Sequence, residues 1–160
     1  MQKITVLCVG KLKESFYKEA VAEYAKRLSR YCKLEIVELP EQRLPEEPSP
    51  AEIQQALQKE AELIGEKLPK GCTVIALCIE GQEMSSEKLA DKMRTLAVDG
   101  ASHLCFLIGG SCGMHPSVKA KAALKLSMSP MTFPHHMARV MLLEQIYRGY
   151  QILEGSKYHK

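Results

Sequence analysis

The chain of 160 residues is 46% hydrophobic and 26% charged, and its formal net charge is +3. These values are typical of an ordinary soluble globular protein, and the length predicts one domain, residues 1–160, with a core of its own. No apolar run is long enough to cross a bilayer, so we expect no membrane partner. The mild positive charge permits an anionic partner without requiring one.

Strand and helix patterns alternate along the chain. Short apolar runs predict strands at residues 3–10, 34–39, 72–79, 104–108 and 123–126. Helical spacing and capping residues predict helices at residues 15–31, 51–68, 86–99, 116–122 and 134–153. The alternation predicts an α/β fold with a mostly parallel sheet of five to six strands and helices on both faces. Ligands of such sheets bind beyond the carboxyl ends of the strands.

The six cysteines form no CxxC pair, and three of them fall inside apolar runs. We therefore expect free thiols in a reducing cytoplasm rather than disulfides or a zinc site. The spacing of His115, His135 and His136 offers no helical metal-binding pair, so surface or capping roles are favoured and no metal is expected.

The segment LSMSPMTFPHH, residues 126–136, has no helical or strand period and is predicted to be a binding loop. Met128, Met131 and Phe133 would give it apolar walls that suit a flat heterocycle and a soft sulfonium centre. Pro134 fits the first turn of the next helix, whose free N–H groups could meet a carboxylate. The alternative is that these side chains only fill the core beneath the loop.

A second loop begins with Gly109 and Gly110, directly after a predicted strand. Glycines there would let a ligand approach the backbone and would permit positive φ, although a plain tight turn is the simpler interpretation. Residues 109–113 also fit the G-x-S-x-G pattern of a hydrolase nucleophile elbow, with Ser111 as nucleophile. The chain is short for such a hydrolase and has no HGGG-like segment, so this alternative is less favoured.

The last helix is apolar on more than one side. Its broad apolar face would hold Val140, Leu142, Leu143, Ile146, Tyr147, Tyr150 and Leu153. Met137, Met141 and Ile152 fall on the opposite side, which predicts a subunit interface and hence a homodimer. Arg139 falls within the apolar face, where it needs a carboxylate or a ligand as partner unless it reaches solvent.

The C-terminal tail combines an aromatic ring, an imidazole and two lysines. A frayed basic terminus is the common interpretation of such a tail. As an RNA-facing element, Tyr158 could stack on a base, Lys157 and Lys160 could meet phosphates, and His159 could accept or donate a proton.

Together these segments resemble the SPOUT-class RNA methyltransferases, most closely those that methylate N3 of a pseudouridine in 23S ribosomal RNA. The resemblance covers the whole chain, from ITVLCVGKLKE through IGG, LSMSPMTFPH and ARVMLLEQIYR to the final YHK. Each motif alone is weak, but the combination is specific. Many relatives end in YHR where this chain has Lys160, which keeps the charge but lacks the bidentate fork of arginine.

The resemblance implies a C-terminal trefoil knot, S-adenosyl-L-methionine as cofactor, and a homodimer with the active site at its interface. Cofactor contacts are implied for Leu77, Gly109, Met128, Ser129, Pro130, Met131, Thr132 and Phe133, and we add Gly110. Tyr158, His159 and Arg139 become catalytic candidates, and Lys157 and Lys160 substrate-binding ones. His159 is our first candidate to accept the N3 proton; positioning alone, with loss of the proton to water, is the alternative. The implied substrate is 23S rRNA in the assembled ribosome of the cytoplasm, and a non-catalytic RNA-binding module remains open.

Overall fold

The computed structural model describes every residue, Met1–Lys160, and contains one five-stranded sheet. Its strands are β1 (Gln2–Val9), β2 (Cys32–Leu39), β3 (Thr73–Glu83), β4 (His103–Ile108) and β5 (Leu124–Ser127). Their order is β2-β1-β4-β3-β5, and every neighbouring pair is parallel. The predicted α/β class and parallel sheet are confirmed, with the lower of the two strand numbers.

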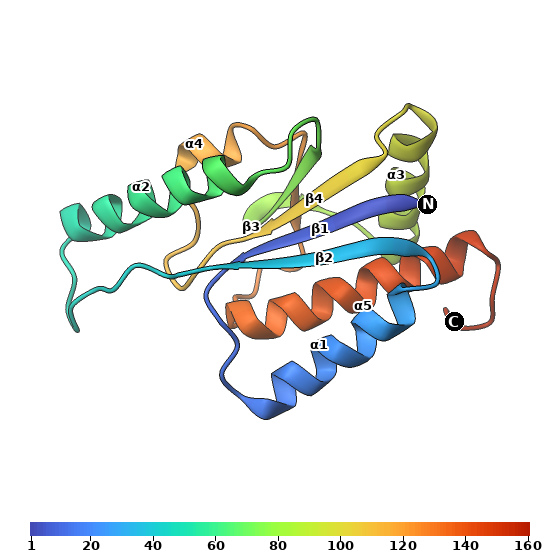
Figure 1. Cartoon of the computed structure of the whole chain (residues 1–160), viewed down its shortest axis with the longest axis horizontal. Helices are drawn as coiled ribbons and strands as arrows, with labels where there is room; N and C mark the ends of the chain where they lie inside the picture. The colour runs from blue at the N-terminus through green and yellow to red at the C-terminus, as the bar shows by residue number, and fades with distance from the viewer.

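Helices cover both faces of this sheet (Figure 1). They are α1 (Ser15–Leu28), α2 (Pro50–Lys67), α3 (Ser86–Val98), α4 (Pro116–Lys119) and α5 (His135–Leu153). The larger core cluster lies between the sheet and α1, α3 and α5, and the smaller one between the sheet and α2 and α4. Because both faces of the sheet are covered, its inner strands β1 and β4 are apolar runs, whereas the edge strand β2 alternates apolar and charged residues. No helix in the structure has both the length and the apolarity to span a membrane.

Local sequence signals start the helices where we expected them. Ser49 accepts a hydrogen bond from the backbone N–H of Glu52, whose side chain accepts one from the N–H of Ser49, and Pro50 follows at the first helical position. Ser85 caps α3 through the N–H of Lys88. These caps satisfy N–H groups that a helix start leaves unpaired.

Strand β3 is longer than predicted because it pairs with β5 twice. Leu126 lies opposite Leu77 and, after a register shift, opposite Gln82. Gly81 lies in the segment between these pairings, and a Cβ there would come 2.8 Å from the carbonyl carbon of Lys125. The prediction that the strand ends at residue 79 was therefore wrong, since the chain returns to β5 after a close backbone crossing that only glycine permits.

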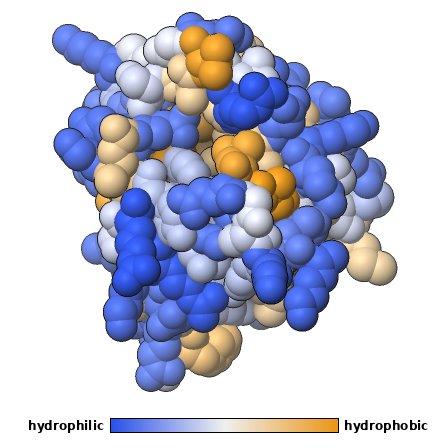
Figure 2. Space-filling view, turned by 90° about the vertical axis from the view of Figure 1, so that its right-hand side faces the viewer, coloured by the Kyte–Doolittle hydropathy of each residue, from blue (hydrophilic) through white to orange (hydrophobic).

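Helix α5 packs its predicted apolar face against the sheet and the neighbouring helices. Leu142, Leu143 and Ile146 are fully buried. Leu153, expected on this face, is 40% exposed because it is the last residue of the helix. Met137, on the other side, is 39% exposed. The face of the molecule that carries both chain termini is mainly hydrophilic, with apolar side chains only in small separate groups (Figure 2).

Candidate active site

A cavity of about 730 Å³ lies at the carboxyl ends of β3, β4 and β5, beside the start of α5. We call it the strand-end cavity. Of the nine residues predicted to contact a cofactor, eight line it: Leu77, Gly109, Gly110, Met128, Ser129, Met131, Thr132 and Phe133. Pro130 is exposed and does not line it. Three segments that are distant in the sequence therefore meet at one cavity, as the strand-end rule for parallel sheets predicts.

Serine side chains shape the loop that forms one wall of the strand-end cavity. The hydroxyl of Ser127 donates to the carbonyl of Ser129, and the hydroxyl of Ser129 accepts from the N–H of Met131. Met128 packs partly on the larger core, whereas Met131 is 73% exposed at the cavity rim. Filling of the core thus explains Met128 in part but not Met131, which leaves an apolar side chain available to a ligand.

The opposite wall is the glycine loop, residues 109–113. A Cβ on Gly109 would lie 2.5 Å from the carbonyl oxygen of Gly113, and a Cβ on Gly110 would lie 2.6 Å from a carboxylate oxygen of Glu41. Only Gly113 has positive φ in this loop, so Gly109 and Gly110 do not use the positive φ that glycine permits. Close approach of backbone and carboxylate is what requires glycine at these two positions.

Glu41 holds the glycine loop from outside the cavity. Its Oε1 accepts hydrogen bonds from both the N–H and the hydroxyl of Ser111, each 2.7 Å long. Burial acts to raise the pKa of Glu41, but the Ser111 bonds and the nearby His135 outweigh it and hold the pKa below its usual value. Ser111 is therefore bonded to a carboxylate and to no histidine, which argues against the hydrolase alternative.

The three histidines occupy two different settings. His115 caps α4 by accepting a hydrogen bond from the N–H of Ser117, which confirms the expected capping role. His135, which lines the cavity, has its ring centroid 4.2 Å from that of its neighbour His136, with the two ring planes tilted at 58°. Burial, followed by the effect of His136, lowers the pKa of His135. The structure contains no group of three or more histidine, cysteine or acidic residues that could hold a metal ion.

Arg139 has the carboxylate partner that its position demands. Its side chain is almost fully buried, and its Nη1 donates to Glu38 at 2.6 Å while Nη2 donates to the carbonyl of Gly10 at 3.1 Å. The N–H of Leu12 also donates to Glu38. Arg139 thus ties α5 to the turn after β1, and burial rules out the alternative that it reaches solvent.

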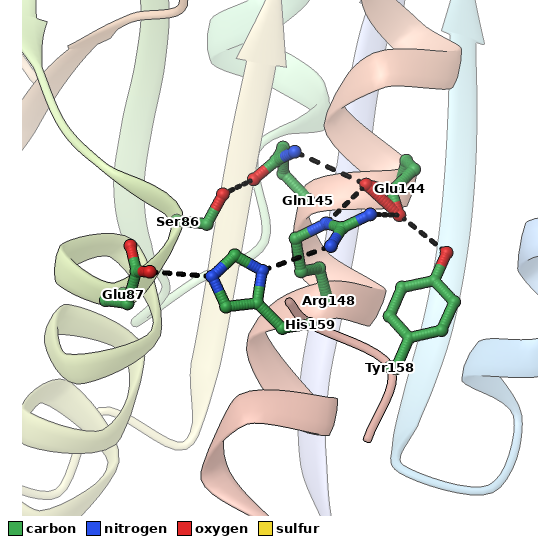
Figure 3. Close-up of polar contacts among 7 residues, drawn as sticks. All are labelled: Ser86, Glu87, Glu144, Gln145, Arg148, Tyr158 and His159. Atoms are coloured by element: carbon green, nitrogen blue, oxygen red, sulfur yellow. Dashed lines mark hydrogen bonds and ion pairs between the residues drawn. The ribbon is translucent and has the colours of Figure 1, made fainter. Parts of the chain in front are cut away.

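A second polar centre joins the tail to α3 and α5 (Figure 3). We call Glu87, Glu144, Arg148, Tyr158 and His159 the C-terminal cluster. Tyr158 donates its hydroxyl proton to Glu144 at 2.9 Å, and Nε of Arg148 donates to the same carboxylate at 2.8 Å. Nη1 of Arg148 contacts Nδ1 of His159 at 3.1 Å, and Nε2 of His159 lies 2.6 Å from Glu87. The tail is therefore docked on its own chain.

The partners of His159 define its proton state. A guanidinium is only a donor, so Nδ1 of His159 must accept from Arg148, and Nε2 must carry the proton donated to Glu87. Both ring nitrogens are thus occupied. Burial and the hydrogen bond to Glu144 raise the pKa of Tyr158 to about 12, so its hydroxyl stays protonated at neutral pH.

A smaller cavity of about 410 Å³ lies beside the strand-end cavity. It shares Leu126 and Met128 with the strand-end cavity and reaches Glu144 of the C-terminal cluster. Along α5, however, His135 and Arg148 are 13 residues apart, which corresponds to roughly 20 Å. The predicted cofactor residues and the predicted tail residues therefore form two separate groups in one chain, and Arg139 belongs to neither.

Several contributing residues were not expected from the sequence. Glu41 lies in a proline-rich stretch, and nothing local marks it as a partner of Ser111. Lys119 and Glu80 line the cavity and form an ion pair across it. The one signal that could have revealed Glu41 is the absence of a side chain at Gly110.

Comparison with known proteins agrees with this arrangement. A family model described as "Predicted SPOUT methyltransferase" matches residues 2–159. The chain therefore belongs to the SPOUT methyltransferase family.

Curated relatives and a solved structure extend this result. The chain is 50% identical to a ribosomal RNA large subunit methyltransferase H from Alkaliphilus oremlandii, over 98% of this chain and 99% of the relative. It is 49% identical to a protein of the same name from Bifidobacterium adolescentis, over 99% of each chain. The structure of a probable methylase family protein from Haemophilus influenzae superposes with a TM-score of 0.56 at 14% identity, covering 99% of this chain and 71% of that one. The last match supports the fold alone.

Proposed function

We propose that the protein is an S-adenosyl-L-methionine-dependent methyltransferase that methylates N3 of a pseudouridine in 23S ribosomal RNA. The observation that carries the proposal is the strand-end cavity, where eight of the nine residues predicted to contact the cofactor meet. Relatives of nearly the same length, named as ribosomal RNA large subunit methyltransferases, support the substrate.

The cavity residues fit the proposed cofactor. Its volume lies within the range of roughly 300–1,000 Å³ that is usual for small-molecule sites. Met128 and Phe133 offer apolar walls for a flat base, and the glycine loop offers backbone at close range. S-adenosyl-L-methionine, when bound, supplies an electrophilic methyl group. The task of the chain is to hold the cofactor and the target nitrogen in line and to exclude water.

The tail is the proposed substrate side. N3 of pseudouridine carries a proton that must be lost before or during attack, and His159 is our candidate to accept it. His159 can do so only at Nδ1, after that nitrogen has exchanged its present partner, Arg148, for the RNA. Tyr158, protonated and aromatic, suits stacking and hydrogen-bond donation, while the exposed Lys157 and Lys160 suit phosphate contacts.

For Arg139, the contacts favour a supporting role over direct contact with RNA. Its guanidinium is bonded to Glu38 and to the carbonyl of Gly10, and the side chain is almost fully buried. We propose that Arg139 holds the first turns of α5, on which His135 and Ala138 line the cavity.

We further propose a homodimer in which the tail of one chain serves the cavity of the other. The observation that no tail residue lines the strand-end cavity of its own chain supports it, as do the exposed Met131 and Met137. The close crossing of Gly81 over β5 is compatible with the C-terminal trefoil knot that the resemblance implies. A target in the assembled ribosome would make the protein cytoplasmic.

The direct test is transfer of a tritiated methyl group from the cofactor to ribosomes that lack the modification. We expect label in the large-subunit RNA, at one pseudouridine, and no label in ribosomes that already carry the methyl group. Free 23S RNA is the second control, because a net charge of +3 is modest for strong binding to RNA alone. Ribosome binding without any label would support the non-catalytic RNA-binding module instead.

A further inference from the structure

We propose that Glu41 is a positioning residue of the strand-end cavity, whose carboxylate holds the glycine loop in the shape that binds cofactor. This inference rests on the proposed function and adds to it a residue that neither touches the cavity nor belongs to any of its motifs. Glu41 comes from the segment between β2 and α2, 70 residues before the loop it holds.

The contacts of Glu41 act on both sides of the cavity mouth. Its Oε1 accepts from the N–H and the hydroxyl of Ser111, while Oε2 lies 3.7 Å from Nε2 of His135 at the start of α5. Ser111 and His135 both line the cavity. The carboxylate of Glu41 is therefore hydrogen-bonded to the glycine loop and lies close to His135, the first residue of α5, whose Nε2 has no hydrogen-bond partner.

The loop is built around this carboxylate. A Cβ on Gly110 would lie 2.6 Å from Oε1 of Glu41, so the glycine makes room for the side chain and not only for a ligand. Within the loop, the N–H of Gly113 donates to the carbonyl of Gly110 at 3.0 Å, which closes a tight turn. Without Glu41, the N–H of Ser111 would lose its partner, and this turn would lose its attachment to the rest of the chain.

The backbone that carries Glu41 is itself held in place. The N–H of the next residue, Gln42, donates to the carboxylate of Glu60 at 2.9 Å, and Glu60 is a buried residue of α2. A path of hydrogen bonds thus runs from α2 through residues 41–42 to Ser111 and the cavity wall. A side chain on a fixed backbone can position a loop, whereas one on a mobile segment could not.

The test compares three variants in the full-length protein. Glu41→Ala removes the acceptor, Glu41→Gln keeps an acceptor oxygen but removes the charge, and Glu47→Ala makes the same truncation at an exposed residue of the same segment that has no hydrogen bond or ion pair. Dissociation constants for S-adenosylmethionine and S-adenosylhomocysteine are measured by calorimetry. Hydrogen exchange of the Ser111 amide is measured without cofactor.

We expect Glu41→Ala to weaken binding of both compounds about tenfold, which is the scale of one charge-assisted hydrogen bond. Glu41→Gln should recover binding to within about threefold, and Glu47→Ala should match wild type. The Ser111 amide should exchange faster only in Glu41→Ala. If that variant does not fold, Ser111→Ala, which removes one of the two bonds, should still weaken both compounds by a factor of about three.

Three results would overturn the proposal. The first is unchanged affinity in Glu41→Ala, and the second is unchanged exchange at Ser111. The third is a loss confined to the cationic sulfonium compound and equal in Glu41→Gln, because that pattern means charge attraction rather than positioning. Failure of wild type to bind either compound would instead count against the proposed function, and the exchange of Ser111 would still report on the attachment of the loop.

Discussion

The strand-end cavity and the C-terminal cluster use opposite kinds of chemistry. The cavity has apolar side chains, backbone groups and a loop held from outside by Glu41. The C-terminal cluster consists of charged and polar side chains that already satisfy one another, from Tyr158 through Glu144 and Arg148 to His159. The difference indicates that the strand-end cavity is already shaped for a small ligand. The C-terminal cluster must instead break some of its present hydrogen bonds before its side chains can act on another molecule.

Breaking the contact between His159 of the tail and Glu87 costs little free energy. Glu87 is 61% exposed in its pair with His159, and exposed ion pairs contribute little to stability because solvent screens them. By contrast, the glycine loop has backbone atoms at distances that admit no side chain. The tail can therefore move on binding RNA or a second chain, while the cavity keeps its shape.

Removing the tail should show most clearly that the cavity and the C-terminal cluster have different roles. Deletion of residues 158–160 should reduce methyl transfer by a factor of about 100 or more, because the target base loses its proposed orienting groups. Cofactor affinity, measured by calorimetry, should stay within about twofold of wild type, since none of these residues lines the strand-end cavity. Full transfer activity without the tail would remove Tyr158 and His159 from the mechanism.

Gly109→Ala should have the opposite effect, a loss of cofactor binding with an unchanged tail. The new Cβ would meet the carbonyl of Gly113 at 2.5 Å, so the glycine loop must shift. We expect cofactor affinity to fall by roughly 10- to 100-fold, since a change of that size corresponds to about 1.4–2.8 kcal/mol. The docking of the tail, followed by hydrogen exchange in residues 156–160, should not change.

Gly65→Ala is the matched control for this substitution. Gly65 lies inside α2, and the nearest atom to its added Cβ is Nζ of Lys121 at 3.6 Å. This change should leave cofactor affinity unaltered and raise stability by up to about 1 kcal/mol, because alanine favours the helix. Equal losses of affinity in both glycine variants would mean that the loop geometry is not what the cavity depends on.

Local patterns were sufficient to predict the elements and one group of site residues. Apolar runs ending in glycine marked the strands, Ser49 with Pro50 marked the start of α2, and the carboxyl ends of the strands located the cavity. These features depend on neighbouring residues and on a general rule of parallel sheets. The family resemblance, with Gly110 added, supplied the nine cofactor residues, of which eight lie around one cavity.

Contacts between distant segments could not be predicted in this way. Arg139 was expected to need a partner, but nothing near it in sequence indicated Glu38, 101 residues away. The second pairing of β3 with β5 and the hydrogen bonds from Ser111 to Glu41 likewise depend on how distant segments meet in the fold. The docked tail was also missed, because its acidic partners come from α3 and α5 rather than from the tail itself.

The smallest expected effect concerns protonation at the cavity. Burial, followed by the neighbouring His136, lowers the pKa of His135, so the folded protein binds this proton less readily than the unfolded chain. The resulting stability is present above the unfolded pKa of about 6.5 and is lost as the pH falls through the lower folded pKa. The free energy of unfolding of wild type, measured by thermal denaturation, should therefore fall more steeply below pH 6.5 than that of His135→Gln, by at most about 1.4 kcal/mol per pH unit. His103, whose pKa is also lowered by burial, is present in both proteins and cancels in the difference. Parallel curves would show that His135 does not titrate differently in the folded state, and the cavity would then be insensitive to pH at this position.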